Sequence, residues 1–537
     1  MTRLLRPDRR ALLFGGGTTL VFLGVGLHVP MYLASADMHF RMAGMGMDGW
    51  MLAGMAILAV GLVLAAWGLF FTPHAPTGAP AAVPEPHPDR PAPSTPAERL
   101  RRPHWRLVAV LIFAVAIDSQ KPYTFTFILP GVAAEYGVSS PAHPVPGAPA
   151  VGWLPFLGIL GTVLGSILWG AIGDRVGRRA ALMYAAVLFV ATSICGAMPG
   201  FWWNAFMCFV MGLGAGGMLP AAYTLLAETM PAKSRGWLVV LVAGVGTALG
   251  FELVAVLADV AMPHLSWRFL WLVGIASGAV LLGLGRFVPE SPRFLLKHGR
   301  RAEAEAVLRH FGAPAPVLET TRHDGGMLAL FTPPYTFITL GLVACALAWG
   351  VVTFGFLTWL PINLSKVDVA SADVNDLLAK SALLALPVSV LVAWLYSRWS
   401  ARLTMVSAAA ITGTVLAVFA AAGTSVGRGS SLMALVVLLL VGCWAVTAVV
   451  TPYSTEVYPT DVRARGAAVV AGAGKLGGVL ALAMTVGGIT PPGIAASAAI
   501  ALVPMLAGAV VLLIYAVETR SRALESVVTT VTSGEIR

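Results

Sequence analysis

Two ionisable residues lie deep inside long apolar runs of the sequence. Asp118 follows Arg106 by 12 residues, which is about 18 Å along a helix rising 1.5 Å per residue. By the same measure Lys475, nine residues after Gly466, is about 14 Å into its run. Charged side chains at such depth in a membrane are costly, and by default they indicate a functional site. A lysine there can bind an anion, and a carboxyl group can take up and release a proton.

Other side chains are weaker candidates for the same site. Lys121 can stand close to Asp118 in the site, or it can form a local ion pair with Asp118 three residues away. Glu252 lies toward the outer end of another apolar run and is the next candidate for the proton. Polar and aromatic side chains that could line a cavity, each of them more often a packing residue when taken alone, are Gln120, Tyr123, Asn204, Trp349 and Trp359.

The composition places these residues in a membrane protein. The 537 residues are 58% hydrophobic and 11% charged, with a mean hydropathy of +0.82. Soluble domains carry roughly 25% charged residues, so most of this surface cannot face water. A disordered chain and a nucleic-acid-binding domain are thereby excluded as the main interpretation. The formal charge of +10 matters mainly through its distribution along the chain.

Fourteen apolar runs are long enough to cross a bilayer, which takes about 20 residues in a helix. They lie at about 11–30, 49–71, 107–129, 151–172, 180–198, 202–227, 236–258, 268–288, 335–360, 376–397, 404–422, 431–452, 467–488 and 494–516. The sequence therefore predicts an all-α polytopic membrane protein with 14 transmembrane helices. The predicted divisions are a two-helix hairpin (1–72), a proline-rich cytoplasmic linker (73–104), a six-helix half (105–288), a cytoplasmic segment (289–334), a second six-helix half (335–516) and a cytoplasmic tail (517–537).

The distribution of basic residues predicts the orientation. With the N-terminus in the cytoplasm, cytoplasmic segments hold 28 of the 35 Lys and Arg residues, outer segments hold five, and two lie within spans. Because lysine and arginine accumulate on the cytoplasmic side, both termini are predicted to be cytoplasmic and the protein to lie in the inner membrane.

An internal repeat relates the two predicted halves. Glu228, Pro231 and Arg235 follow the fourth span of the first half, and Glu456, Pro459 and Arg463 follow the fourth span of the second. Each residue recurs at an offset of 228, and the same offset carries Glu290 onto Glu518. Duplicated halves suit an alternating-access carrier with its binding site between them, near the middle of the membrane.

Several motifs resemble those of the major facilitator superfamily over about residues 105–525. The run from Gly170 to Arg179 resembles its signature loop, and the runs at 289–295 and 456–463 resemble its sugar-porter and metabolite–proton symporter branches. Residues 354–361 and 474–477 resemble the aromatic-acid and nicotinate-type symporters. Where the aromatic-acid branch usually has a second acid in its first span, this chain reads Asp118-Ser-Gln-Lys121.

The cytoplasmic acids and bases are predicted to form a conformational latch that closes when the halves meet. The resemblance implies that Asp174 meets the N-terminus of the eleventh helix of the core, where a helix dipole stabilises a carboxylate. We expect an arginine at 175, 178 or 179 to pair with Glu228, and Arg398 or Arg402 to pair with Glu456. The complete candidate set is Asp174, Arg175, Arg178, Arg179, Glu228, Arg235, Glu290, Arg293, Arg398, Arg402, Glu456, Arg463, Arg465 and Glu518.

No motif predicts an enzyme, a cofactor or a metal site within the core. The sequence has no phosphate-binding Gly-x-x-x-x-Gly-Lys-Ser/Thr run. Its four cysteines, Cys195, Cys208, Cys345 and Cys443, are widely spaced inside apolar runs, unlike a disulfide framework or a zinc site.

The predicted function is secondary active transport, as a proton-coupled symporter of a small organic anion. The predicted partners are that substrate, H+ and the lipid bilayer, without nucleic acid. An efflux carrier for amphipathic compounds is one alternative. Another is a copper-handling or sensing protein, because thioethers and imidazoles suit copper(I), although methionine is also an ordinary packing residue. The outer part of the hairpin holds such residues at His28, Met31, Asp37, Met38, His39, Met42, Met45, Met47, Asp48 and Met51.

Overall fold

The computed structural model describes residues 9–71, 100–312, 330–365, 371–425, 430–458, 460–487, 493–520 and 531. These residues form helices and no strand. Thirteen helical segments are long and apolar enough to cross a membrane. The predicted span 151–172 is a helix as well, with a shorter apolar stretch at Trp153–Trp169. The prediction of an all-helical membrane protein is confirmed.

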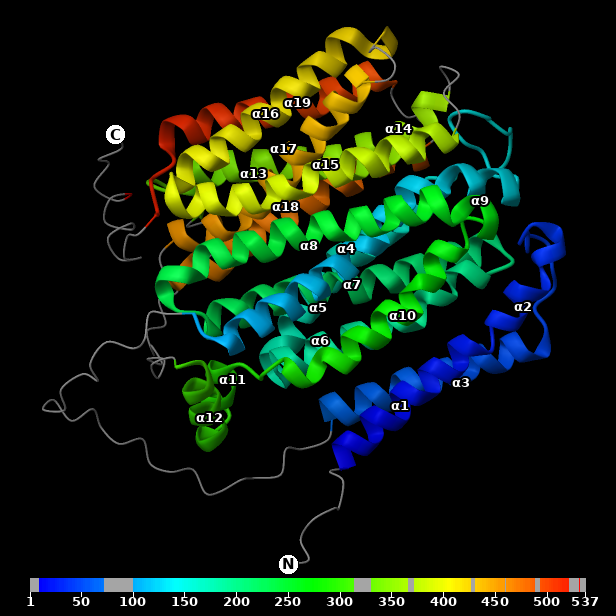
Figure 1. The fold of residues 1–537 in the computed structure, drawn as a ribbon, viewed down its shortest axis with the longest axis horizontal. Helices are drawn as coiled ribbons and strands as arrows, with labels where there is room; N and C mark the ends of the chain where they lie inside the picture. Colours follow the sequence, from blue (N-terminus) through cyan, green and yellow to red (C-terminus); the bar gives the residue numbers. More distant parts are fainter. Residues whose placement is uncertain are drawn as a thin grey trace, which may run out of the picture.

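The first bundle of helices runs from residue 102 to residue 287. Its long helices are α4 (Arg102–Tyr136), α5 (Trp153–Val176), α6 (Arg178–Ala191), α7 (Phe201–Thr229), α8 (Ala232–Val260) and α10 (Phe269–Leu284). Short elements extend or join them: η3 (Thr192–Ala197), α9 (Met262–Leu265) and η4 (Gly285–Phe287). Two small helices, α11 (Pro292–Lys297) and α12 (Arg301–Phe311), follow at one end of the bundle (Figure 1).

The second bundle has the same plan. It consists of α13 (Thr336–Gly350), η6 (Val351–Phe356), α14 (Leu357–Ser365), α15 (Ser371–Arg398), α16 (Ala401–Ala422), η7 (Gly423–Ser425), α17 (Ser430–Val457), α18 (Thr460–Val486) and α19 (Ile494–Tyr515). The two bundles lie against each other (Figure 1), with α8 packed on α15 and α17, and α5 packed on α18. Any ligand held between α5 and α18 would therefore contact both bundles.

Glycines allow the closest helix contacts. A Cβ atom at Gly212 of α7 would clash with the backbone of Gly158 on α5, and one at Gly350 of α13 would clash with the backbone of Gly474 on α18. Small residues at such crossings let membrane helices pack backbone to backbone. At α13 and α18 this packing fixes the position of the helix that carries Lys475.

The N-terminal hairpin packs on the first bundle. It comprises α1 (Arg9–Gly26), α2 (Val29–Ala34), η1 (Ala36–Met38), α3 (Gly49–Ala66) and η2 (Trp67–Phe71). Its two long helices lie side by side at the edge of the molecule (Figure 1) and contact α6. The Tyr184 hydroxyl of α6 donates a hydrogen bond to the Leu62 carbonyl at 3.0 Å, and the Tyr32 hydroxyl donates one to the Leu265 carbonyl at 2.6 Å.

A buried ion pair ties the tip of this hairpin to the bundle. The Arg268 guanidinium contacts the Glu135 carboxylate at 2.6 Å, and their side chains are 0% and 5% exposed. The same carboxylate accepts hydrogen bonds from the backbone N–H groups of Met42 and Ala43 at 2.7 and 3.1 Å. Arg268 also donates to the Met198 carbonyl at 2.9 Å. One acid therefore joins the hairpin loop, the end of α4 and the start of α10.

Replacing Arg268 with alanine should lower the free energy of unfolding by about 3–5 kcal/mol, because Glu135 would be left as a buried, unpaired charge. The control is Arg301→Ala, which breaks the pair of Arg301 with Glu305, whose side chains are 52% and 54% exposed. That pair should contribute about 0–1 kcal/mol. Thermal unfolding of the detergent-solubilised variants measures both effects, and equal losses would contradict the assignment.

Candidate functional site

Lys475 on α18 extends from the second bundle into the first. Its ammonium group donates hydrogen bonds to the Thr162 carbonyl at 3.3 Å and to the Ser166 hydroxyl, both on α5. The side chain is partly buried. A positive charge with only neutral oxygen partners can accept an anion in exchange for them.

Asp118 on α4 is the acid that interacts with this lysine. Its side chain is 4% exposed, and among the described residues its Oδ1 atom has no hydrogen-bond partner. Asp118 and Lys475 interact electrostatically although these two described side chains form no direct ion pair. Tyr223 on α7 is a further polar neighbour of Asp118. The structure thus brings together the two leading candidates of the sequence, one from each bundle.

An aromatic cluster bridges the two bundles beside this pair. The ring of Tyr123 on α4 meets the ring of Phe251 on α8 edge to face, with centroids 5.0 Å apart. Phe251 in turn meets Trp444 on α17 at 5.9 Å. Aromatic edge-to-face contacts of this kind favour planar apolar groups as further partners.

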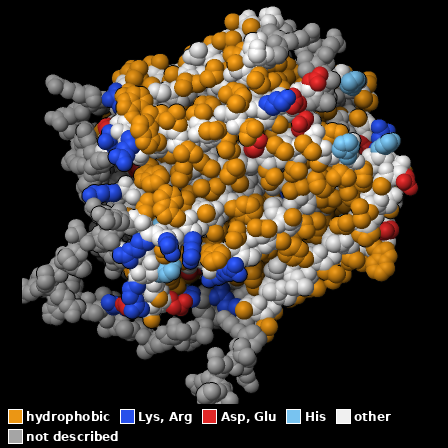
Figure 2. All heavy atoms as spheres, in the orientation of Figure 1, with side chains coloured by type: hydrophobic (Ala, Val, Ile, Leu, Met, Phe, Trp, Pro, Cys, Tyr) orange, Lys and Arg blue, Asp and Glu red, His pale blue; other side chains and the backbone are white. Residues whose placement is uncertain are grey.

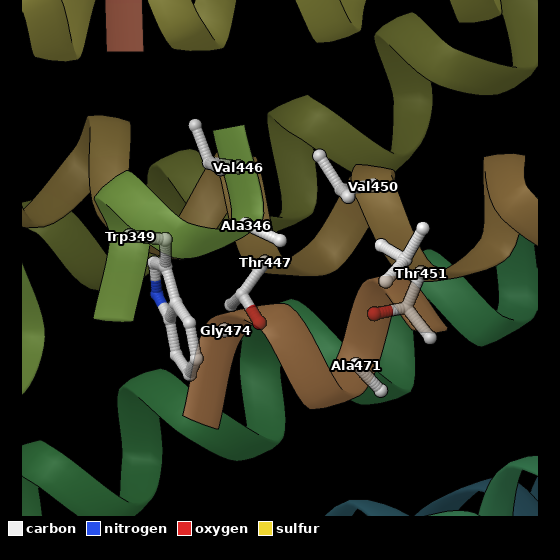
Figure 3. A pocket seen from close by; sticks show the side chains of 9 residues that line it. Ala346, Trp349, Val446, Thr447, Val450, Thr451, Ala471 and Gly474 are labelled. Atoms are coloured by element: carbon white, nitrogen blue, oxygen red, sulfur yellow. The ribbon is translucent and has the colours of Figure 1, made fainter. Parts of the chain in front are cut away.

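A small, partly open pocket lies between α13, α17 and α18. It is lined by Ala346, Trp349, Val446, Thr447, Val450, Thr451, Val470, Ala471 and Gly474. Figure 3 shows Trp349 at one end of this space, Thr451 toward the other, and Thr447 between them. The Trp349 Nε1–H has no hydrogen-bond partner in the described residues. The pocket therefore offers an aromatic face and an unused donor from α13 and hydroxyl groups from α17, and its lining on α18 ends at Gly474, one residue before Lys475.

Lys121 points away from this site into the first bundle. Its ammonium donates to the Phe189 carbonyl at 2.7 Å and to the Thr192 hydroxyl at 2.8 Å. These acceptors lie where α6 gives way to η3, and a helix end leaves carbonyls that a cation can satisfy. The alternative of a local ion pair between Lys121 and Asp118 is wrong, because the amine is held by α6 and η3.

The remaining cavity candidates are scattered. Gln120 is buried against Gly250 of α8, and Trp359 on α14 lies beside Gly152, 3.6 Å from where its Cβ would be. Glu252 is partly buried, and one of its carboxylate oxygens is buried without a partner in the described part of the chain. The next residue of α8, Leu253, is exposed on the surface of the molecule.

Glutamates cap helix starts at the end of the molecule that carries α11 and α12. Glu290 accepts hydrogen bonds from the backbone N–H groups of Arg178 and Arg179 at 2.8 and 3.2 Å, in the first turn of α6. Glu518 accepts one from the backbone N–H of Ala401 at 3.0 Å, in the first turn of α16. Burial raises the pKa of the Glu290 carboxyl above its usual range, and the backbone N–H donors partly offset this shift.

Glu228 and Glu456 have hydroxyl partners in place of the arginines predicted for them. Glu228 accepts a hydrogen bond from Ser291, and Glu456 accepts one from Thr519 at 2.6 Å. Ser291 and Thr519 are themselves separated by 228 residues, so the repeat includes the partners as well as the acids. Sequence reasoning missed these two hydroxyl residues, which the offset could have identified.

The predicted arginines otherwise have diverse surroundings. Arg178 donates to the Gly173 carbonyl at 3.1 Å, and Arg402 donates to the Leu513 carbonyl. Arg235 on α8 interacts electrostatically with Glu456 on α17, across the two bundles. Exposed members of the predicted latch are Arg175, Arg179, Arg293, Arg398 and Arg465. The side chains of Asp174 and Arg463 lie outside the described residues.

Replacing Glu456 with alanine should slow transport at least about tenfold while leaving substrate affinity within a factor of two or so. Glu456 interacts across the bundles with Arg235 and accepts a hydrogen bond from Tyr396 at 2.7 Å, and a bond to a charged group is worth about 1.5–3 kcal/mol. The measurements are initial uptake rate and equilibrium binding, with Glu305→Ala as the exposed control. A loss of binding with an unchanged rate would contradict the latch.

The Glu135–Arg268 pair and the α5 partners of Lys475 were not among the sequence candidates. Glu135 and Arg268 are separated by 133 residues and resemble ordinary loop charges in sequence.

Among the described residues, no group of three His, Cys, Asp or Glu side chains could hold a metal ion.

Comparisons with known proteins agree with this architecture. Residues 123–482 match the family model of the Major Facilitator Superfamily. The chain is 27% identical over 442 residues to the niacin transporter NiaP of Acinetobacter baylyi, covering 79% of this chain and 96% of that protein. It is 26% identical over 387 residues to a gentisate transporter of Corynebacterium glutamicum, covering 70% and 80%. The structure of the proton:xylose symporter XylE has the same fold, with a TM-score of 0.64 at 18% identity, and the match covers 79% of this chain and 98% of XylE.

Proposed function

The chain belongs to the major facilitator superfamily and is a secondary transporter, and we propose that it is a proton-coupled symporter of a small aromatic carboxylate. The observation that carries the proposal is the bridging position of Lys475. Its ammonium reaches from α18 to α5 and interacts with the buried acid Asp118 on α4. An anion bound to Lys475 would lie between the bundles, where alternating access requires the substrate.

Proton coupling follows from electrostatics at this pair. Lys475 favours the ionised form of Asp118, because opposite charges stabilise each other when both are buried. An anion that binds the ammonium removes part of this support and so favours protonation of the carboxyl group. Protonation then raises the affinity for the anion by the same factor, because coupling free energies are reciprocal. Substrate and proton would therefore be carried together.

The substrate class rests on the chemistry around Lys475 and on the relatives. The small pocket between α13, α17 and α18, whose lining ends at Gly474, has the indole of Trp349 and the hydroxyl groups of Thr447 and Thr451, which are groups that favour a planar ring with polar substituents. Two of the relatives are named as transporters of niacin and of gentisate, both of which carry a carboxylate on an aromatic ring. A lysine in the centre of the site disfavours a cationic substrate, which argues against an efflux carrier for amphipathic cations.

We further propose the predicted orientation and domain division, with both termini on the cytoplasmic side of the inner membrane. Figure 2 supports it, because most of the visible Lys and Arg side chains gather toward the end that carries α11 and α12, a broad hydrophobic belt covers the middle, and Asp, Glu and His side chains with a few Lys or Arg lie toward the opposite end. Such asymmetry is typical of cytoplasmic loops. Cysteine accessibility at either end of the molecule in intact cells tests the orientation.

Thermal-shift screening of the purified protein tests the substrate class. Nicotinate and hydroxylated benzoates should raise the unfolding temperature, because a ligand bound only by the folded state stabilises it. Xylose and amphipathic quaternary ammonium compounds should not. Stabilisation by the sugar or by the cations, without any by the acids, would overturn the proposal.

A further inference from the structure

The two long helices of the N-terminal hairpin pack in regular layers. Several contacts at the glycines pair the two sides of the hairpin so that the two residue numbers add to 82, while others, such as Gly17 with Gly61 and Gly24 with Gly54, add to 78. The pairs that add to 82 are Phe14 with Gly68, Gly17 with Ala65, Val21 with Gly61, Gly24 with Leu58, and His28 with Gly54. The spacing alternates between three and four residues, as in a coiled coil. One step of three residues from the contact between His28 and Gly54 toward the tip of the hairpin leads to Met31 on α2 and to Met51 on α3, which form the next layer of this pattern.

His28 has an unused nitrogen inside this packing. Its side chain is 0% exposed, and its Nδ1 atom lies 2.8 Å from the Gly24 carbonyl, to which it can only donate. A neutral imidazole that donates from Nδ1 carries its lone pair on Nε2. The Nε2 atom is buried and has no hydrogen-bond partner among the described residues. The Cε1 and Nδ1 atoms of the ring lie 2.8 and 3.0 Å from where a Cβ of Gly54 would be, so the imidazole packs directly on the backbone of α3.

The two methionines of the next layer supply soft ligands. Met31 is 7% exposed and Met51 is 0% exposed. Each lies three residues from the His28 layer, about 4.5 Å along its own helix. A methionine thioether spans such a gap easily because its side chain is long and unbranched. One imidazole nitrogen and two thioethers can therefore converge at the tip of the hairpin.

We propose that His28, Met31 and Met51 form a binding site for copper(I). Thioether and imidazole ligands together select this soft ion over hard cations, which require oxygen ligands. Asp48, which begins α3 and accepts a hydrogen bond from the Met51 backbone N–H at 2.7 Å, interacts electrostatically with His28. Its negative charge balances the single positive charge of the ion. The site lies away from Lys475 and is independent of the transported substrate.

Copper(I) titration of the full-length protein in detergent tests this site. Under reducing conditions, in competition with bicinchoninate, the protein should bind one copper(I) ion with a dissociation constant below 1 μM or so, as expected for a preformed soft-ligand set. Zinc(II) at equal concentration should not displace it. Wild-type protein that binds no copper(I) in this range would overturn the proposal.

Replacement of both methionines by leucine keeps the size and the apolar character of the layer while removing both sulfur ligands. The double variant Met31→Leu/Met51→Leu should weaken copper(I) binding at least about 100-fold, beyond the 10- to 100-fold typical for loss of an outer-shell partner. The matched control is Met38→Leu, because Met38 lies in the same tip but is 46% exposed. Equal affinity of the double variant and the wild type would show that the two methionines only pack, and would overturn the assignment.

Discussion

Replacing Lys475 with glutamine should weaken binding of the transported carboxylate at least about 30-fold. The ammonium is partly buried, and its direct partners among the described residues are the Thr162 carbonyl and the Ser166 hydroxyl. Loss of one partner from a buried, hydrogen-bonded charge pair costs about 2–5 kcal/mol, and 2 kcal/mol corresponds to about a 30-fold change in the dissociation constant. Glutamine keeps a hydrogen-bond donor at the position but removes the charge.

The matched control is Lys380→Gln. Lys380 is also a lysine within a long helix, but its side chain is 62% exposed and pairs with Asp376 at 2.7 Å on the same helix. Equilibrium binding of the aromatic acid that stabilises the wild type best should be unchanged in this variant. If both variants lost affinity equally, the loss would follow from the lower net positive charge of the protein, and Lys475 would not bind the anion directly.

Replacing Asp118 with asparagine should abolish accumulation of substrate against its gradient while preserving exchange. Asparagine keeps the size of the side chain but cannot take up a proton, so the carrier would resemble one that is permanently protonated. Such a carrier can still move substrate in either direction when substrate is present on both sides. The expected result is uptake that a pH gradient no longer drives, at an exchange rate within about tenfold of the wild type.

Glu252→Gln is the comparison for this variant. Glu252 is the other carboxyl within the first bundle that has a buried oxygen without a partner among the described residues. Its accumulation should match that of the wild type, because the account assigns the coupled proton to Asp118. If Glu252→Gln loses accumulation and Asp118→Asn retains it, the proton site is Glu252.

The duplication could be predicted from the sequence because it depends on residues that repeat at a fixed offset. Glu228 and Glu456 are conspicuous at helix ends, and the structure places both on hydroxyl partners, Ser291 and Thr519, that repeat at the same offset. The partners themselves were not predicted, because charge pairing with the abundant arginines was the simpler expectation. Both acids are partly buried, where a hydroxyl donor is easily accommodated, whereas many of the arginines are exposed.

The directions of side chains within a helix were harder to predict. Asp118 and Lys121 are one turn apart, yet Asp118 interacts with α18 while the amine of Lys121 bonds α6 and η3. The acceptor at Phe189 is available because α6 ends there and η3 begins, and this change of helix type leaves no clear signal in the sequence. The pair of Glu135 and Arg268 was likewise hidden, because each residue in isolation resembles a solvated loop charge.

The central claim is that substrate and proton move together through Asp118. The direct test is to record internal pH in proteoliposomes with an entrapped fluorescent dye while an aromatic carboxylate is added outside. The account predicts that the wild type acidifies the interior only when the acid is present, and that Asp118→Asn does not acidify it although labelled substrate still exchanges. Substrate-dependent acidification of equal size in Asp118→Asn, or none in the wild type, would contradict the account.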